Sequence, residues 1–179
     1  MYVGQKLGNI EGDSKMDIFS GLLDGLGLQP KQTNKVSVEE CVQMVQRLLL
    51  ECGVEPNNSK LDIQNCLGWN IKKGSAEIFI VLGKNQLIDE MTLEVFSPIL
   101  KLPKQNILPF YRRCLEINRY LIGCALCVEK DSVMLVAERE LNGLSYEELE
   151  TMIIGIANAA DMLDDDLAKE FGAQLVGVS

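Results

Sequence analysis

Six cysteines are the residues of this chain whose type and spacing could support metal binding or redox chemistry. Cys124 and Cys127 form a C-x-x-C pair, a spacing found in zinc sites and in redox-active dithiols. Both fall in a segment with the pattern of a β-strand, where residues at an odd separation point to opposite faces. The sequence has no second C-x-x-C pair and no histidine. We therefore predict buried, reduced thiols and no metal site.

Acidic residues near the C-terminus are the second set that could bind a cation. They include Asp161, Asp164, Asp165 and Asp166. This cluster lacks the alternating ligands and the glycine of a calcium-binding loop, and we interpret it as a solvated helix face. The chain also has no phosphate-binding glycine motif and no nucleophile motif, and without histidine it lacks the commonest general base. We predict no catalytic residue and no cofactor, and hence no enzyme.

Composition limits the class of partner. The net charge of −9 argues against nucleic-acid binding, which usually depends on a basic surface. No apolar run approaches the roughly 20 residues of a membrane span, and no secretion signal is visible. These features predict a cytoplasmic protein that binds neither nucleic acid nor membrane.

The first 35 residues are interpreted as an N-terminal extension, followed by a domain over residues 36–172 and a tail over 173–179. Within the extension, Ser14–Leu26 has the apolar spacing of a short amphipathic helix. Its inward face would carry Ile18, Phe19, Leu22 and Leu23. This helix could be an arm packed on its own domain, or a docking segment for a partner or a neighbouring subunit.

Capping boxes and apolar periodicity define the elements of the domain. Ser37 with Glu40, and Ser145 with Glu148, have the S-x-x-E spacing that begins a helix. A polar loop is expected at Glu55–Lys60. The predicted order is a helix over 38–52, strands over Cys66–Lys72, Ala76–Gly83 and Glu90–Leu100, a helix over Leu108–Leu121, strands over Gly123–Glu129 and Ser132–Leu141, and a helix over Ser145–Phe171. This order, α-βββ-α-ββ-α, predicts an α+β fold with an antiparallel five-stranded sheet.

The predicted strands are apolar on both faces and therefore need cover on both. The first and last helices could cover one face of the sheet. The middle helix or a second copy of the chain could cover the other face. The middle helix itself has two apolar sides, which indicates burial on both. One side carries Leu108, Tyr111 and Leu115; the other carries Phe110, Cys114, Ile117 and Leu121. We predict a homodimer whose interface includes Phe110, Cys114, Ile117 and Leu121 or their opposite-side neighbours.

Asn118 lies among these apolar residues. We interpret its amide as a structural cap on a loop or strand end, with ligand binding as the alternative.

Several short motifs resemble a known family. They are Phe96-Ser97-Pro98-Ile99-Leu100-Lys101-Leu102-Pro103, Leu115-Glu116-Ile117-Asn118, Ala125-Leu126-Cys127-Val128, and Leu141-Asn142-Gly143-Leu144-Ser145 with Glu147-Glu148-Leu149. Together they resemble the bacterial YbjN-like family, which shares the type III secretion chaperone-like fold, over residues 36–172. The resemblance implies a small cytoplasmic protein, often dimeric, with a chaperone-like or regulatory role and no established catalytic residues.

Two classes of function follow. The first is a non-enzymatic, chaperone-like or regulatory module that binds another polypeptide of unknown identity. The alternative is a small-molecule-binding or metabolic regulatory protein with a pocket against the sheet.

Overall fold

The computed structural model describes residues 35–85 and 87–176. In this part of the chain the elements are α2 (Val38–Glu51), β1 (Lys60–Ile63), β2 (Cys66–Lys73), β3 (Ala76–Lys84), β4 (Met91–Lys101), α3 (Ile107–Asn118), β5 (Ala125–Glu129), β6 (Ser132–Glu140) and α4 (Tyr146–Phe171). The predicted helix at Ser14–Leu26, with Ile18, Phe19, Leu22 and Leu23, lies outside the described residues. No described helix combines the length and the apolar composition that crossing a bilayer requires.

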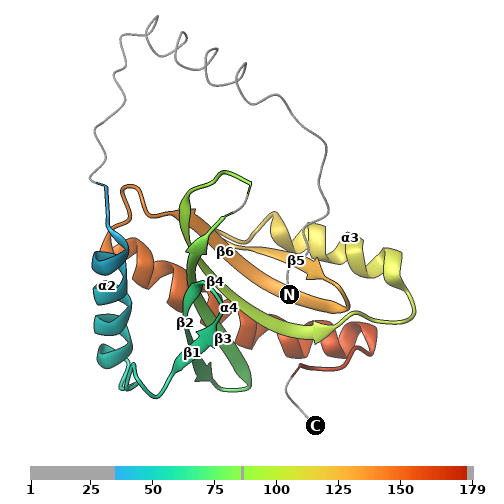
Figure 1. Cartoon of the computed structure of the whole chain (residues 1–179). Helices are drawn as coiled ribbons and strands as arrows, with labels where there is room; N and C mark the ends of the chain where they lie inside the picture. The colour runs from blue at the N-terminus through green and yellow to red at the C-terminus, as the bar shows by residue number, and fades with distance from the viewer. Residues whose placement is uncertain (1–34, 86, 177–179) are drawn as a thin grey trace, which may run out of the picture. The chain divides into compact units, whose positions relative to one another are not determined.

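The strands form one antiparallel sheet in the order β1-β2-β3-β4-β6-β5 (Figure 1). The predicted α+β class with an antiparallel sheet is confirmed, but the predicted five strands and the order α-βββ-α-ββ-α are wrong. The additional strand is β1, which pairs Lys60 with Trp69 and Ile63 with Cys66. Its turn places Asn65 at φ 62°, a left-handed conformation that asparagine tolerates well. Because β1 is short and alternates polar with apolar residues, it has no continuous apolar run.

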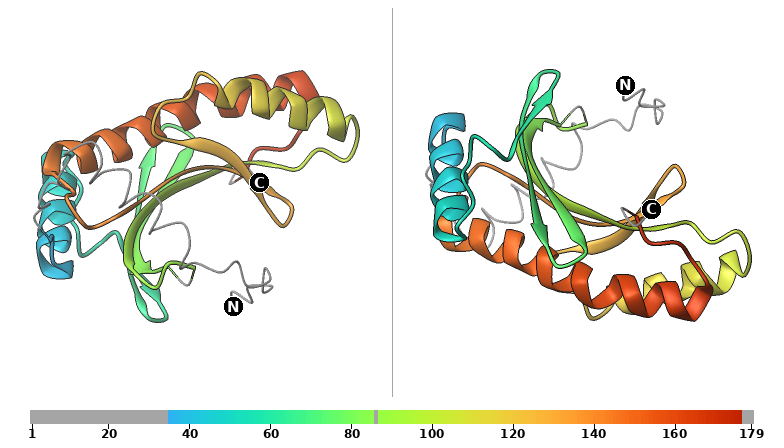
Figure 2. Two further views of the ribbon diagram at one scale, coloured as in Figure 1. Left: turned by 90° about the horizontal axis from the view of Figure 1, so that it is seen from above. Right: turned by 90° about the horizontal axis from the view of Figure 1, so that it is seen from below.

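The helices cover one face of the sheet. Figure 2 shows a strongly curved sheet with α4 and α3 side by side on its convex side. The contact between the two helices includes the edge-on ring pair of Phe110 and Phe171, 5.1 Å apart, and an ion pair of Arg113 with Glu170 at 3.2 Å. The alternative that the middle helix covers the second face of the sheet is therefore wrong, because α3 packs on the same side as α4.

Alternate strand residues fill the core beneath these helices. The fully buried ones include Trp69, Ile78, Ile80, Leu82, Leu93, Val95, Val133 and Leu135. α2 completes this layer by packing against the start of α4, where the Tyr146 hydroxyl donates to Glu51 at 2.6 Å and Arg47 lies over the Tyr146 ring. The core is thus formed between one sheet face and three helices in the described part of the chain.

The concave face carries the intervening side chains. The rings of Phe79 and Phe96 stack there at 5.1 Å, and Glu94 lies directly opposite Glu138 on the adjacent strand. Burial raises the pKa of the Glu94 carboxyl, and the neighbouring charges of Glu138 and Glu129 raise it further. An ionised Glu94 is therefore unfavourable in the folded protein.

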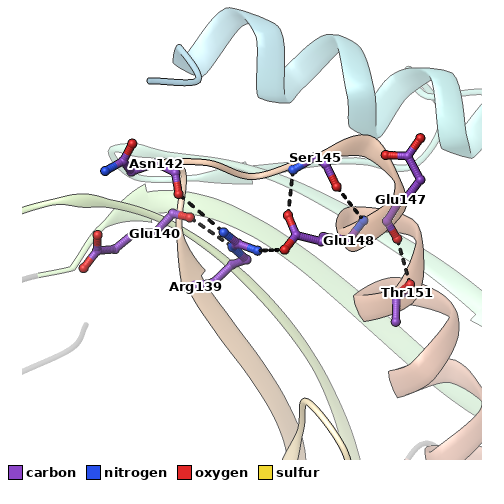
Figure 3. Close-up of polar contacts among 7 residues, drawn as sticks. All are labelled: Arg139, Glu140, Asn142, Ser145, Glu147, Glu148 and Thr151. Carbon is purple, nitrogen blue, oxygen red and sulfur yellow. Dashed lines mark hydrogen bonds and ion pairs between the residues drawn. The ribbon is translucent and has the colours of Figure 1, made fainter. Parts of the chain in front are cut away.

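The joint between β6 and α4 is held by the carboxylate of Glu148 (Figure 3). One oxygen of Glu148 accepts from the Ser145 backbone N–H at 2.8 Å, and the Ser145 hydroxyl accepts from the Glu148 N–H at 3.2 Å. The other oxygen lies 2.7 Å from Arg139 Nη1, at the end of β6. The predicted capping box is confirmed, and the bonds to Ser145, followed by the pair with Arg139, lower the pKa of Glu148.

Further along α4, the turn between β2 and β3 packs against the acidic residues. The Ser75 hydroxyl donates to Asp164 at 3.0 Å, and Lys73 Nζ donates to the side-chain oxygen of Asn158. Asp164 is only 4% exposed, so the interpretation of the whole acidic cluster as solvated is wrong for this residue. A buried carboxylate requires hydrogen-bond donors, which here are Ser75 and the Asp165 backbone N–H.

We predict that Glu148→Gln lowers the free energy of unfolding at pH 7. Because the folded-state pKa of Glu148 is lowered, its stabilising effect is present above the unfolded-state pKa and is lost as pH falls through the folded-state value. The difference between wild type and variant in chemical denaturation should thus shrink with acidification. Asp166→Asn, at an exposed position of the same helix, is the control and should lower the free energy of unfolding at pH 7 less than Glu148→Gln does; an equal effect in both would contradict the assignment.

Glu94→Gln should change the stability in the opposite direction and should stabilise the folded protein at high pH. A carboxyl with a raised folded-state pKa gives its full contribution below the unfolded-state pKa, and that contribution is lost as pH rises through the folded-state value. The variant should therefore melt at a higher temperature than wild type at pH 8 and at nearly the same temperature at pH 4. A melting temperature below that of wild type at pH 8 would show that ionised Glu94 is not destabilising.

Candidate binding surface

α3 divides its two apolar sides between the core and the surface. Phe110 is fully buried and Cys114 is 8% exposed, while Ile117 and the nearby Leu121 are half-buried against the same core. These four residues of the predicted interface are thus brought together inside the chain. The helix ends at Asn118, earlier than the predicted Leu121, and both Tyr120 and Leu121 donate to the Ile117 carbonyl.

The opposite side of α3 faces outward. Leu108 is 76% exposed, Leu115 is 70% exposed and Tyr111 is 37% exposed. Large apolar side chains that gather on one helix face at such exposure are typical of a surface that another molecule covers. We call Leu108, Tyr111 and Leu115 the outer side of α3.

Asn118 joins α3 to the edge strand β5. Its Nδ2 donates to the Leu126 carbonyl at 3.1 Å, and its Oδ1 accepts from the Leu126 N–H at 2.7 Å. The prediction that the amide caps a strand is confirmed, since both polar groups of one β5 residue are satisfied by one side chain. This pair of bonds ties the end of α3 to the sheet edge.

A groove of about 230 Å³ lies between the outer side of α3 and the sheet edge. Its walls are apolar apart from the Asn118 amide and the Tyr111 hydroxyl. The lining residues are Tyr111, Cys114, Leu115, Asn118, Leu126, Cys127, Val128 and Val133. The groove and the outer side of α3 form one continuous apolar region, because Tyr111 and Leu115 belong to both.

A second groove, of about 310 Å³, lies between the α3–β5 connection and α4. It is lined by Tyr120, Leu121, Ile122, Cys124, Gly155, Asn158, Ala159 and Met162. Ile122 beside it is 95% exposed, and Tyr120 is 77% exposed. Leu121 of the predicted interface, which packs partly against the core, also lines this second groove.

Charged side chains on α3 are paired locally. Arg112 lies 2.8 Å from Glu116 one turn later, and Arg113 pairs with Glu170 of α4. Both pairs are solvent-exposed and therefore contribute little to stability. They border the outer side of α3 with both signs of charge.

The thiols near the grooves are not activated for chemistry. All six cysteines are free, and the prediction of buried thiols holds for Cys41 and Cys114 but is wrong for Cys52 and Cys127, which are exposed. Burial raises the pKa of Cys114 to about 11. Although Cys127 is exposed as a residue, partial desolvation of its thiol and the charges of Glu94 and Glu129 raise its pKa, which favours the protonated, weakly nucleophilic form.

Comparison with known proteins places the fold. No protein-family model and no curated protein matches the sequence. Among solved structures, a chain of the ExsC–ExsE complex is similar, with a TM-score of 0.54 and 12% identity over 72% of this chain and 94% of that chain. YbjN from E. coli is similar with a TM-score of 0.45 and 11% identity over 75% of this chain and 95% of that chain.

The likeness to the chain of the ExsC–ExsE complex defines the class at the level of the fold. The chain has the type III secretion chaperone-like fold that the sequence motifs predicted, and the agreement covers nearly all of the similar chain from the ExsC–ExsE complex. At 12% identity the comparison carries no information on individual site residues.

Sequence reasoning missed the groove and the exposure of the outer side of α3. The spacing of apolar residues indicated both apolar sides of this helix. The same spacing is expected whether a side is buried by its own chain or by a second chain, so it could not separate the two cases. The charge pattern gave only a partial signal, because Arg112 and Arg119 border Leu115 at helical spacing. Arg113, however, lies three residues after Phe110 on the buried side and pairs with Glu170.

The two sides of α3 should respond differently to truncation. Phe110→Ala should lower the free energy of unfolding by about 3–5 kcal/mol, because it leaves a cavity under α3 and α4. Leu115→Ala should change it by no more than about 0.5 kcal/mol at a protein concentration low enough to keep the chain monomeric. Urea denaturation of both variants checks this, and a large loss for Leu115→Ala alone would reverse the assignment of the two sides.

Proposed function

We propose that this protein is a non-enzymatic polypeptide-binding module, chaperone-like or regulatory, that acts as a homodimer through the outer side of α3. The observation that carries the proposal is the continuous apolar region formed by Leu108, Tyr111, Leu115 and the adjoining groove. Single exposed leucines are common on protein surfaces, whereas a contiguous apolar region of this kind usually marks a binding site. Binding another polypeptide there would be favourable because it removes apolar surface from water.

The two opposite charges that border the outer side of α3, Arg112 and Glu116, support self-association of this side. Two α3 helices related by a two-fold axis would bury Leu115 against its copy and bring Arg112 of one chain near Glu116 of the other. Opposite charges around an apolar centre are the common arrangement of such interfaces. Of the two predicted alternatives, we therefore assign the interface to the side opposite Phe110, Cys114, Ile117 and Leu121, since Phe110 and Cys114 are already buried within the chain.

The fold and the apolar surfaces favour a different polypeptide, not a small molecule, as the client. The similar chain occurs in a complex of ExsC with ExsE, and that likeness supports the proposal by analogy of fold. The second groove, with Tyr120, Ile122 and Met162 exposed around it, offers apolar side-chain pockets apart from the outer side of α3. Extended or helical segments commonly bind such grooves by inserting alternate or periodic apolar side chains.

The small-molecule alternative is less well supported. Ligand pockets usually measure about 300–1,000 Å³ and place several polar groups around the ligand. The first groove measures about 230 Å³, and the Asn118 amide on its wall is already committed to Leu126. The second groove, of about 310 Å³, is at the lower end of that range, and the side-chain oxygen of Asn158 in its lining already accepts from Lys73. The free thiol of Cys127 provides no activated group for catalysis, since its pKa is raised.

Leu115→Glu tests the homodimer. A charge at the centre of the interface should cost several kcal/mol of association and weaken the dimer by at least about a hundredfold. Light scattering over a range of micromolar concentrations should then show a monomer near 19.9 kDa for the variant and a dimer for wild type. Leu87→Glu, at a leucine that is 85% exposed and outside this surface, is the matched control and should remain dimeric.

Wild type that is monomeric at every concentration would contradict the dimer but leave the client proposal standing. The client proposal is tested by affinity capture from native cell extract, compared with a metabolite screen by thermal shift. Failure to enrich any protein, together with a strong thermal shift by a metabolite, would favour the small-molecule alternative.

A further inference from the structure

β5 is an edge strand of the sheet, because its second side has no neighbouring strand in the described part of the chain. In an antiparallel ladder the peptide groups of successive residues point alternately to the two sides of the strand. Leu126 points its N–H and its carbonyl away from β6, since both groups bond to Asn118. An open edge of this kind is a template for another strand.

The Asn118 side chain reproduces the contact that a neighbouring strand would make. In a hydrogen-bonded antiparallel pair, one residue accepts from the N–H and donates to the carbonyl of the residue opposite. Asn118 does both, at 2.7 Å to the Leu126 N–H and 3.1 Å to the Leu126 carbonyl. A strand added along this edge would have to displace the carboxamide before its ladder could pass Leu126.

The rest of this edge has little other protection. Val128 points its peptide groups to the same side as Leu126 because the alternation has a period of two. Among residues 35–85 and 87–176, no hydrogen bond joins another group to that side of Val128. The strand sequence, Ala125-Leu126-Cys127-Val128-Glu129, contains neither the proline nor the lysine that commonly guards an edge.

We propose that Asn118 closes the outer edge of β5 to strand addition, and that the strand it excludes is β5 of a second copy of this chain. β5 is suited to pair with itself because antiparallel pairing of two identical strands is two-fold symmetric and its apolar residues meet across the axis. With the edge closed, a second copy contacts this end of the molecule through side chains alone. The inference concerns the edge itself and does not require the proposed function to be correct.

Asn118→Ala in the full chain tests the inference. Removal of both bonds should produce an association that wild type lacks, or strengthen the existing one by at least about tenfold, in sedimentation equilibrium. Amide hydrogen exchange over residues 124–128 gives the discriminating readout. If β5 pairs with its copy, exchange in the variant should slow as protein concentration rises, whereas a purely structural loss would speed exchange equally at all concentrations.

A second substitution identifies the edge that the variant uses. Val128→Pro in the Asn118→Ala background removes one outward N–H without breaking a bond to β6, and should abolish the new association. Val128→Ala in the same background is the matched control for the lost side chain and should retain it. Exchange that is fast at every concentration, with unchanged association, would overturn the proposal.

Two further comparisons keep the test decisive if Asn118→Ala does not fold. Asn118→Asp keeps the acceptor for the Leu126 N–H and removes the donor to its carbonyl, so it should give a smaller increase in association. In the wild-type background, Val128→Pro and Val128→Ala should associate equally. A weaker association of Val128→Pro than of Val128→Ala would show that wild type already uses this edge, and would overturn the proposal without any Asn118 variant.

Discussion

The packing of α4 along the convex face of the sheet is the constraint on which the rest of the structure depends. Its 26 residues give a length of about 39 Å, and its apolar stripe follows strands β3, β4 and β6. α2 then packs at its beginning and α3 beside its end, on the same side of the sheet. Because α4 already occupies the face, α3 can bury only one of its two apolar sides within the chain.

This division explains why the surfaces near α3 look as they do. The buried side of α3 contributes Phe110 and Cys114 to the core, and the outer side with its groove remains as apolar surface next to an edge strand. Polar contacts hold the joints around it: Glu148 with Arg139 and Ser145 at one end of α4, and Asn118 with Leu126 at the sheet edge. An apolar face and a closed strand edge, side by side, favour recognition through side chains.

Several elements could be predicted because their signals are local. A capping box needs residues three apart, and the hairpin between β2 and β3 needs a short turn with Gly74 at positive φ, so both are encoded within a few residues. β1 escaped prediction because an edge strand of alternating polar and apolar residues buries too little to leave an apolar run. Asp164 escaped because its burial depends on Ser75, which is far away in the sequence.

Within the described residues, the sequence by itself determined the helices, most of the strands, the antiparallel α+β class and the two apolar sides of α3. Only the tertiary structure decided which face of the sheet the helices share, which side of α3 is buried, and what the Asn118 amide bonds. The physical reason is that periodicity records how much apolar surface a segment carries, whereas the partner that covers it is set by competition among distant segments for one sheet face. A helix with two apolar sides is the same in sequence whether its second side meets its own chain, another copy or a client.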